Sequence, residues 1–174
     1  MIWMVVGGIM YWGRASRPTA QLVTAYVGHS DLAVKSGTRR VQAIERMEEM
    51  LNGLSFEERQ KLERDGTTRG FFQQLTQDEQ VAFLDATLPA GFKQLMDHFN
   101  KMDSAHRKEI VDRALAEMKK HQGEGPPPNI DSKLAQRMID QGMRSFYNDA
   151  SADSKLDMAP LIEQMQINLQ SGGR

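Results

Sequence analysis

Asp103, His106 and Glu109 are the side chains whose types and spacing come closest to a chemical site, because they recur at every third position. On one helix this spacing places an imidazole beside carboxylates, and Glu-x-x-His pairs of this kind bind metal in helical di-iron proteins. Those centres take several such motifs from different helices, whereas this chain offers a single imperfect copy. The three residues also lie on the flank opposite the apolar positions Ile110 and Leu115, so we expect charge pairs that face water.

Three further histidines, His29, His98 and His121, complete the set. His98 adjoins Phe99 on an apolar helix face, which predicts a rim residue rather than a ligand. The motifs of zinc proteases, nucleophile elbows, phosphate-binding loops and dinucleotide-binding folds are absent. With no cysteine in the chain, thiolate chemistry, Cys-ligated zinc, iron–sulfur clusters and disulfides are excluded. The sequence therefore predicts no catalytic, cofactor-binding or metal-binding residues, and it leans away from an enzyme without excluding one.

The candidate residues lie in the strongest helical pattern of the chain, the stretch from Leu75 to Met118. Thr76 is followed three residues later by Glu79, which predicts a capping box at the start of a helix. Pro89 is expected to end that helix, since proline lacks the N–H and clashes with the preceding turn. Asp103 is expected to open the last of three successive helices. Apolar residues at helical spacing follow both breaks: Phe92, Leu95, Met96 and Phe99, then Ile110, Val111, Ala114, Leu115 and Met118.

Similar patterns predict helices along the rest of the chain, over residues 18–28, 38–51, 55–66, about 131–148 and 151–170. In the second of these, Val41 begins the core face and Arg40 lies on the solvated face. A short apolar insert, Gly70-Phe71-Phe72, is expected to plug the core. Pro160 is expected either to kink the last helix or to mark a restart after Asp157.

The predicted fold class is all-α, because alternating β-branched runs are absent outside the N-terminal segment. We expect a compact domain of six to eight amphipathic helices, arranged as an irregular bundle or a short helical-hairpin array. Three helix starts share one shape: Leu54–Leu62, Leu75–Leu84 and Met102–Val111. Their unequal spacing favours common capping chemistry over a true repeat of stacked hairpins.

The first thirteen residues, MIWMVVGGIMYWG, carry no charge. A helix of this length rises about 20 Å, short of the ~30 Å hydrocarbon core of a bilayer. Three interpretations are open: a membrane anchor, with the segment as the C-terminal half of a longer transmembrane helix; a buried helix; or a signal-type segment. Trp3, Tyr11 and Trp12 resemble an aromatic belt, and Arg14 and Arg17 follow directly, so we favour the anchor. The side of the membrane stays undetermined.

A Gly- and Pro-rich stretch, GEGPPPN, separates the central helices from the last two. Three consecutive prolines favour an extended spacer. The sequence therefore predicts an apolar segment over residues 1–17, a helical core over 18–122, a Pro/Gly linker over 123–130, a C-terminal helical pair over 131–170 and a frayed tail over 171–174. Whether the C-terminal pair packs on the core is left open.

The charge of the chain is balanced, with 22 basic and 23 acidic residues. The balance also holds from segment to segment, and none has the basic excess that binding to a phosphate backbone requires. No nucleic-acid partner is therefore expected. A protein partner is expected, the membrane is the second partner through residues 1–17, and the oligomeric state is not predicted.

Leu75-Thr76 followed by Gln80 approximates the L-T-x-x-Q segments of a known family. In this the chain resembles the periplasmic stress chaperones of the Spy and CpxP type. The broader pattern of a leucine, a capping Ser or Thr and early acids is also similar to the acidic helical repeat domain of magnesium transporters of the MgtE type. No functional residue is carried over from either resemblance.

These observations lead to three functional hypotheses. The first is a membrane-tethered, non-enzymatic helical domain that binds a protein partner or organises a complex. The second is a chaperone-like holdase of the cell envelope, which should present a partly apolar concave surface. The third is a metal-dependent enzyme or sensor that uses His106 with Asp103 and Glu109, and the absence of matching motifs on other helices argues against it.

Overall fold

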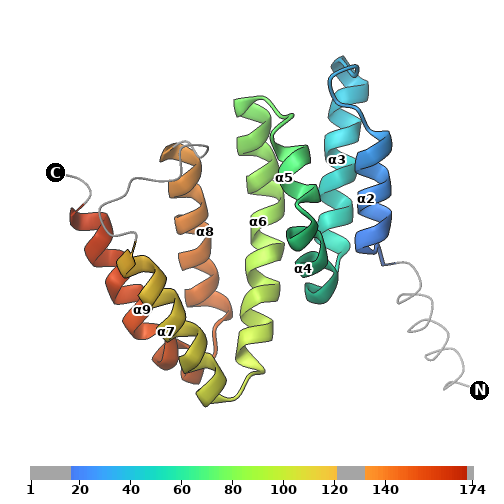
Figure 1. Ribbon diagram of the computed structural model, residues 1–174. Helices are drawn as coiled ribbons and strands as arrows, with labels where there is room; N and C mark the ends of the chain where they lie inside the picture. The colour runs from blue at the N-terminus through green and yellow to red at the C-terminus, as the bar shows by residue number, and fades with distance from the viewer. Residues whose placement is uncertain (1–16, 121–131, 172–174) are drawn as a thin grey trace, which may run out of the picture. The chain divides into compact units, whose positions relative to one another are not determined.

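The computed structural model describes residues 17–120 and 132–171 (Figure 1). All regular secondary structure within these ranges is helical, so the predicted all-α class is confirmed. The helices described there are α2 (Ala20–His29), α3 (Gly37–Gly53), α4 (Phe56–Asp65), α5 (Thr67–Phe72), α6 (Gln77–Asn100), α7 (Ser104–Lys120), α8 (Ser132–Asp149) and α9 (Ala152–Ser171). Residues 1–16 of the expected membrane anchor, the Pro/Gly linker, His121 and the tail after Ser171 lie outside the described residues.

The helices group into two units, unit 1 ending at Thr87 and unit 2 beginning at Leu88. Both units share α6, because their boundary falls inside that helix. The boundary expected from the sequence falls at the Pro/Gly linker instead, with α7 in the helical core and α8 and α9 in a C-terminal pair. In the structure α7 packs extensively against α9 within unit 2. The C-terminal helical pair therefore packs on the last helix of the predicted core.

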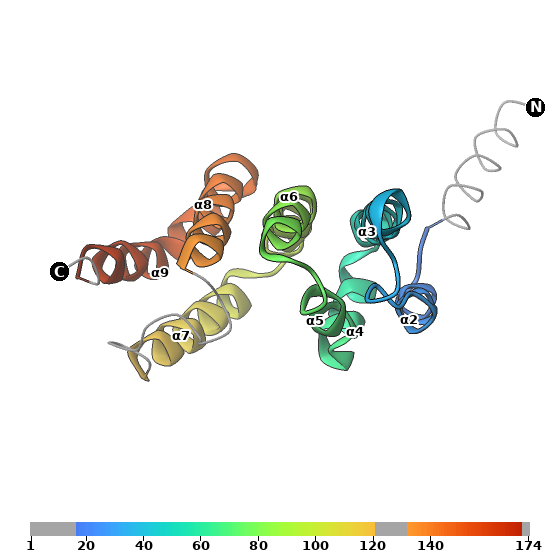
Figure 2. The ribbon, with the colours of Figure 1, turned by 90° about the horizontal axis from the view of Figure 1, so that it is seen from above.

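Unit 1 is built around one apolar cluster. In this unit α2 lies beside α3 and α4, as both views of the ribbon show (Figures 1 and 2). Phe71, in the short helix α5, is fully buried in this cluster. The centre of its ring lies 5.8 Å from the centre of the Phe83 ring. The prediction that the insert at Gly70–Phe72 plugs the core is confirmed. The buried members are Ala20, Val23, Leu32, Ala43, Ile44, Met47, Met50, Leu51, Leu54, Leu62, Phe71, Leu75 and Phe83.

Three of the helices start at the residues that the sequence indicated. The side chains of Ser55, Thr76 and Asp103 each accept a backbone N–H from the residue three positions on, at 3.3, 3.3 and 3.0 Å. At Thr76 the reciprocal bond also forms, because the Glu79 carboxylate accepts the Thr76 N–H at 2.8 Å. These caps satisfy N–H groups that have no partner inside their helix.

Pro89 does not end a helix, and the prediction of three helices between Leu75 and Met118 is wrong. One helix, α6, runs from Gln77 to Asn100 with Pro89 inside it. A proline inside a helix removes the bond to the carbonyl four residues earlier and costs about 3 kcal/mol. Pro89 and Asp85 both lie on the exposed side, where water solvates that carbonyl. Apolar burial on the other side of α6 offsets the loss.

Pro160 behaves in the same way in α9. The alternative that a new helix restarts after Asp157 is wrong, since α9 continues from Ala152 to Ser171 through Pro160. The carbonyl that loses its helical partner belongs to Leu156, and both Leu156 and Pro160 are exposed. A proline on the solvated face of a helix is therefore tolerated twice in this chain.

Two positions of α3 face the opposite way from the prediction. Val41, placed on the core face, is 52% exposed, and Ala43 takes the buried position instead. Arg40, placed on the solvated face, is largely buried and binds several groups. At the start of α3, a charged side chain with several partners is therefore less exposed than the apolar residue that follows it.

Unit 2 has a smaller apolar cluster. Met96, Phe146 and Ala150 are its buried members among the described residues, and Met158 and Ile162 pack against them. The helices α6 and α8 approach closely at Gly142, where a Cβ atom would lie 3.3 Å from the ring of Phe92. Between α7 and α9, Arg107 and Ser104 of α7 bind Asp157 of α9.

Candidate functional site

The predicted trio of Asp103, His106 and Glu109 lies on the solvated surface of α7, as expected. The side chains of His106 and Glu109 are more than half exposed, and Nδ1 of His106 lies 4.0 Å from Oε2 of Glu109. Asp103 caps the helix, and the backbone N–H of His106 lowers the pKa of its carboxyl group. Arg113 pairs with Glu109 and lowers the pKa of that carboxyl group. The trio consists of one cap and surface charge pairs.

The other histidines do not extend the trio. His98 is half-buried at the rim of α6, as predicted, and Nδ1 of His29 lies 2.7 Å from the carbonyl oxygen of Ala25. Within residues 17–120 and 132–171, no three His, Asp or Glu side chains form a group that could hold a metal ion.

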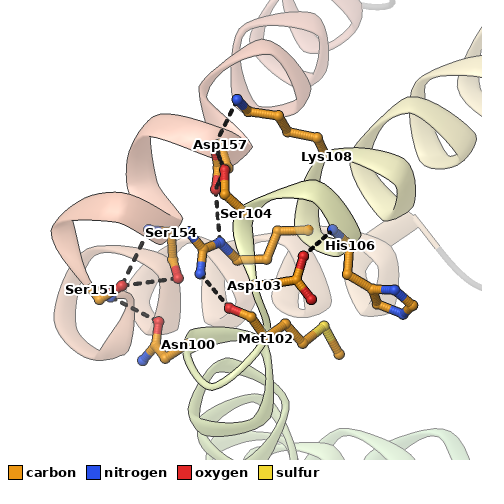
Figure 3. Close-up of polar contacts among 10 residues, drawn as sticks. Asn100, Met102, Asp103, Ser104, His106, Lys108, Ser151, Ser154 and Asp157 are labelled. Carbon is orange, nitrogen blue, oxygen red and sulfur yellow. Dashed lines mark hydrogen bonds and ion pairs between the residues drawn. The ribbon is translucent and has the colours of Figure 1, made fainter.

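A buried ion pair lies next to the trio, and sequence reasoning missed it. Nε of Arg107 donates to Oδ2 of Asp157 at 2.7 Å, and both side chains are only 8% exposed. Nη1 of Arg107 also donates to the carbonyl oxygen of Met102 at 2.6 Å. Ser104 donates its hydroxyl to the Asp157 carboxylate at 3.2 Å, and Nζ of Lys108 lies 3.9 Å away (Figure 3). We call this group, Met102, Ser104, Arg107, Lys108 and Asp157, the unit 2 clamp.

A second set of bonds ties the junction of α8 and α9 to the end of α6. The Asn100 amide donates to the carbonyl oxygen of Asp149 at 2.8 Å and accepts the N–H of Ser151 at 2.9 Å. Ser151 caps α9 by accepting the N–H of Ser154 at 3.1 Å, and the two hydroxyls lie 2.9 Å apart. Ser154 is fully buried, whereas Ser151 is exposed at the start of α9 (Figure 3).

The clamp controls the charge state of Asp157. The hydrogen bond from Arg107 holds the pKa of the Asp157 carboxyl group below its ordinary value, with smaller contributions from Ser104 and Lys108. The carboxylate is therefore ionised at neutral pH and fully engaged. A carboxylate held in this state is a poor general acid or base near pH 7, because its pKa lies far from the working pH.

Unit 1 has a comparable group around Arg40. Its guanidinium binds Glu79 in a bidentate manner, with Nε to Oε1 and Nη2 to Oε2 both at 2.7 Å. It also donates to the carbonyl oxygens of Leu32 at 2.6 Å and Gln74 at 2.9 Å. The hydrogen bond from Arg40 lowers the pKa of Glu79 to about 2. We call these four residues the unit 1 clamp.

Neither clamp contains a buried polar side-chain atom without a hydrogen-bond partner. No buried side-chain nitrogen or oxygen in the described part of the chain lacks a hydrogen-bond partner. A site prepared for a substrate or cofactor normally presents unpaired donors or acceptors to it. The clamps therefore join helices, and their chemistry is that of structural support.

A signal for Asp157 is present in the sequence. The stretch from Leu156 to Ile162 reads LDMAPLI, in which Asp157 is the only charged residue among apolar ones. An acid in such a run is expected to be buried with a partner or to face away from the core. Arg107 gives no comparable signal, because it lies among the charged residues of the α7 start.

One exposed face of α9 carries large apolar side chains. Leu156 is 73% exposed and Ile167 is 49% exposed. Pro160 and Glu163 between them are exposed as well. Intervals of four, three and four residues place these side chains on one face of the helix. We call Leu156, Pro160, Glu163 and Ile167 the α9 stripe.

Comparison with known proteins found no family model, no curated protein and no solved structure that matches this chain. Among the described helices, none combines the length and the apolar composition that crossing a bilayer requires.

Proposed function

We propose that this chain is a membrane-tethered, non-enzymatic helical domain that binds a protein partner. Residues 1–17 serve as the tether, and the α9 stripe serves as the contact surface. The stripe is the observation that carries the proposal. A single exposed leucine is ordinary in a soluble protein, but Leu156 and Ile167 lie on one face with Pro160 between them.

The stripe has the dimensions of a helix-docking surface. Eleven residues separate its ends, which corresponds to about 16 Å along the helix axis. Each exposed aliphatic side chain would gain about 1.5–3 kcal/mol on complete burial against a partner. Glu163 lies between Pro160 and Ile167, so a partner has to match one charged group within an otherwise apolar contact. Asp157, next to Leu156 in the sequence, binds Arg107 of α7 and so holds α9 in place beside the stripe.

The tether is supported by the composition of the N-terminal segment. Its thirteen uncharged residues include aromatic side chains near both ends and are followed by Arg14 and Arg17. This order, apolar then aromatic then basic, is typical of a segment that meets a membrane interface. Residues 1–16 lie outside the described residues, so the sequence alone supports this part of the proposal.

Site-specific photo-crosslinking tests the partner. The full chain carries a photoreactive amino acid at Leu156 or Ile167 in its native membranes, and at Asp112 on the exposed side of α7 as the control. We expect one discrete adduct from the two stripe positions and none from Asp112. A ladder of many adducts from the stripe would favour the holdase hypothesis, and equal labelling from Asp112 would overturn the proposal.

Flotation with lipid vesicles tests the tether. The full chain is expected to float with vesicles, and the substitution Ile9→Lys is expected to abolish flotation because a lysine in the apolar segment is costly to insert. The substitution Val34→Lys, at an exposed apolar position of unit 1, is the matched control. Flotation that is unchanged by Ile9→Lys would contradict the tether.

A further inference from the structure

The chain enters unit 1 from the N-terminal segment through a close contact at Pro18. The ring of Pro18 packs against the last residue of α3, Gly53. A Cβ atom at Gly53 would lie 2.9 Å from both Cγ and Cδ of Pro18, closer than such atoms approach one another. Glycine is therefore required at this position by the proline ring, and the ring is in turn held against the end of α3.

The two residues after Pro18 are fixed by hydrogen bonds. The hydroxyl of Thr19 accepts the N–H of Leu22 at 3.3 Å and caps α2. The N–H of Ala20 donates to Oε2 of Glu58 at 2.7 Å, so that a carboxylate from α4 lies at the positive end of α2. Glu58 is itself held by Lys61 and by its place in the first turn of α4.

These contacts leave little freedom where the chain enters the domain. Proline fixes its own φ angle. Thr19 caps α2, and the N–H of Ala20 is bound to the Glu58 carboxylate. A flexible linker of glycine and serine would let a domain rotate about its tether. Here the path of the backbone is determined from Pro18 onward, at the end of unit 1 where α3 ends and α2 and α4 begin.

We infer that residues Pro18–Ala20 form a rigid collar that holds this end of unit 1 against a lipid surface. The inference depends on the tether proposed above. Arg17, exposed next to the collar, would lie among the lipid headgroups, where basic residues beside an apolar segment are favoured. The opposite end of unit 1, which includes Val34, lies about 25 Å away along the seventeen residues of α3.

Nitroxide labels test the orientation, since the chain contains no cysteine and accepts single labels cleanly. The full chain carries either Gln21→Cys, in the first turn of α2, or Val34→Cys, and both positions are exposed. Each is bound to vesicles that contain a nickel-chelating lipid, whose headgroup relaxes only nearby nitroxides. We expect relaxation several-fold stronger for the label at Gln21 than for the label at Val34.

Substitutions at Pro18 and Gly53 test whether their contact sets the orientation of unit 1. Gly53→Ala introduces the Cβ atom that overlaps the Pro18 ring, and Pro18→Gly removes the ring. Both variants should float with vesicles as the parent does. The ratio of nitroxide relaxation at Gln21 to that at Val34 should fall to about one. Gly28→Ala is the matched control, because its Cβ atom would meet nothing within 4 Å, and it should retain the contrast.

The outcomes separate the collar from the tether. Flotation with equal relaxation at both labels, or with stronger relaxation at Val34, would overturn the collar and leave the tether standing. Full contrast in both Gly53→Ala and Pro18→Gly would show that the collar does not set the orientation. Loss of flotation by the parent chain would overturn the tether, and the collar with it.

Discussion

The two clamps use the same parts in different surroundings. Arg40 and Arg107 are each the fourth residue of their helix, and each binds one carboxylate and a backbone carbonyl from the preceding loop. The pair of Arg40 and Glu79 is bidentate, and its side chains are 18% and 24% exposed. The pair of Arg107 and Asp157 has one direct bond and is 8% exposed on both sides.

This difference follows the size of the apolar core beside each clamp. Unit 1 has an extensive apolar cluster, and its clamp closes one end of a structure that burial already stabilises. The apolar cluster of unit 2 is small among the described residues, and the buried pair of Arg107 and Asp157 joins α7 to α9 directly. Breaking the buried pair is expected to cost more, because the remaining charge has less access to water.

The largest effect is predicted for Arg107→Met, which keeps the apolar stem and removes the charge. Asp157 is then left buried without its main counter-charge, and we expect unit 2 to lose about 3 kcal/mol of stability. Amide hydrogen exchange of α7 and α9, together with urea unfolding, measures the loss. Arg113→Met, an exposed pair member in the same helix, should change stability by less than about 0.5 kcal/mol. Equal effects of Arg107→Met and Arg113→Met would show that the buried charge pair contributes no more to stability than the exposed one.

An intermediate effect is predicted for Glu79→Gln, which keeps a capping residue and removes the charge. The pKa of Glu79 is lowered from 4.5 to about 2. A lowered pKa stabilises the fold above the unfolded value, so the pair contributes at most about 3 kcal/mol at pH 7. This contribution is lost as the pH falls from about 4.5 to about 2. Unfolding free energies of parent and variant should therefore differ at pH 7 and converge near pH 2.

A smaller net change is predicted for the double substitution Arg107→Met with Asp157→Leu. Replacing both charges by apolar side chains removes the penalty of an unpaired charge, and such swaps are often neutral or stabilising. We expect most of the stability lost in Arg107→Met to return. Urea unfolding measures the recovery, and a double variant no better than the single one would show that the pair itself stabilises unit 2.

The smallest effect is predicted for Glu49→Gln in α3. Glu49 pairs with Arg46, and both side chains are well over half exposed. Exposed pairs of this kind contribute about 0–1 kcal/mol, so we expect a change below about 0.5 kcal/mol in the unfolding free energy. A loss as large as that of Glu79→Gln would show that burial does not distinguish the charge pairs of this chain.

The capping residues explain why the helices could be located from the sequence. Helix starts could be predicted at Ser55, Thr76 and Asp103, because a capping side chain binds an N–H only three residues further along the chain. Pro89 and Pro160 misled the prediction because their effect depends on which side of the helix meets water, which is a property of the packed structure. The same limit applies to Val41, whose exposure depends on how α3 packs and not on its apolar character.

The clamps were harder to predict because their partners lie far apart in the sequence. Arg107 and Asp157 are fifty residues apart, and Arg40 and Glu79 are thirty-nine apart. Charge at these positions is compatible with an ordinary solvated face, and the apolar residues around Asp157 were the one local signal, which the sequence prediction did not use. The exposure of Asp103, His106 and Glu109 could be predicted because it follows from helical spacing alone.

The contiguity of the two units bears on how the chain is made. Every buried member of the unit 1 cluster lies between Ala20 and Phe83, so its core needs nothing that follows α6. At ~5–20 residues per second, synthesis from Leu88 to Ser171 takes roughly 4–17 s. Unit 1 has that time to fold on the ribosome. Arg40 can therefore pair with Glu79 before Asp157, the carboxylate of the other clamp, has been added to the chain.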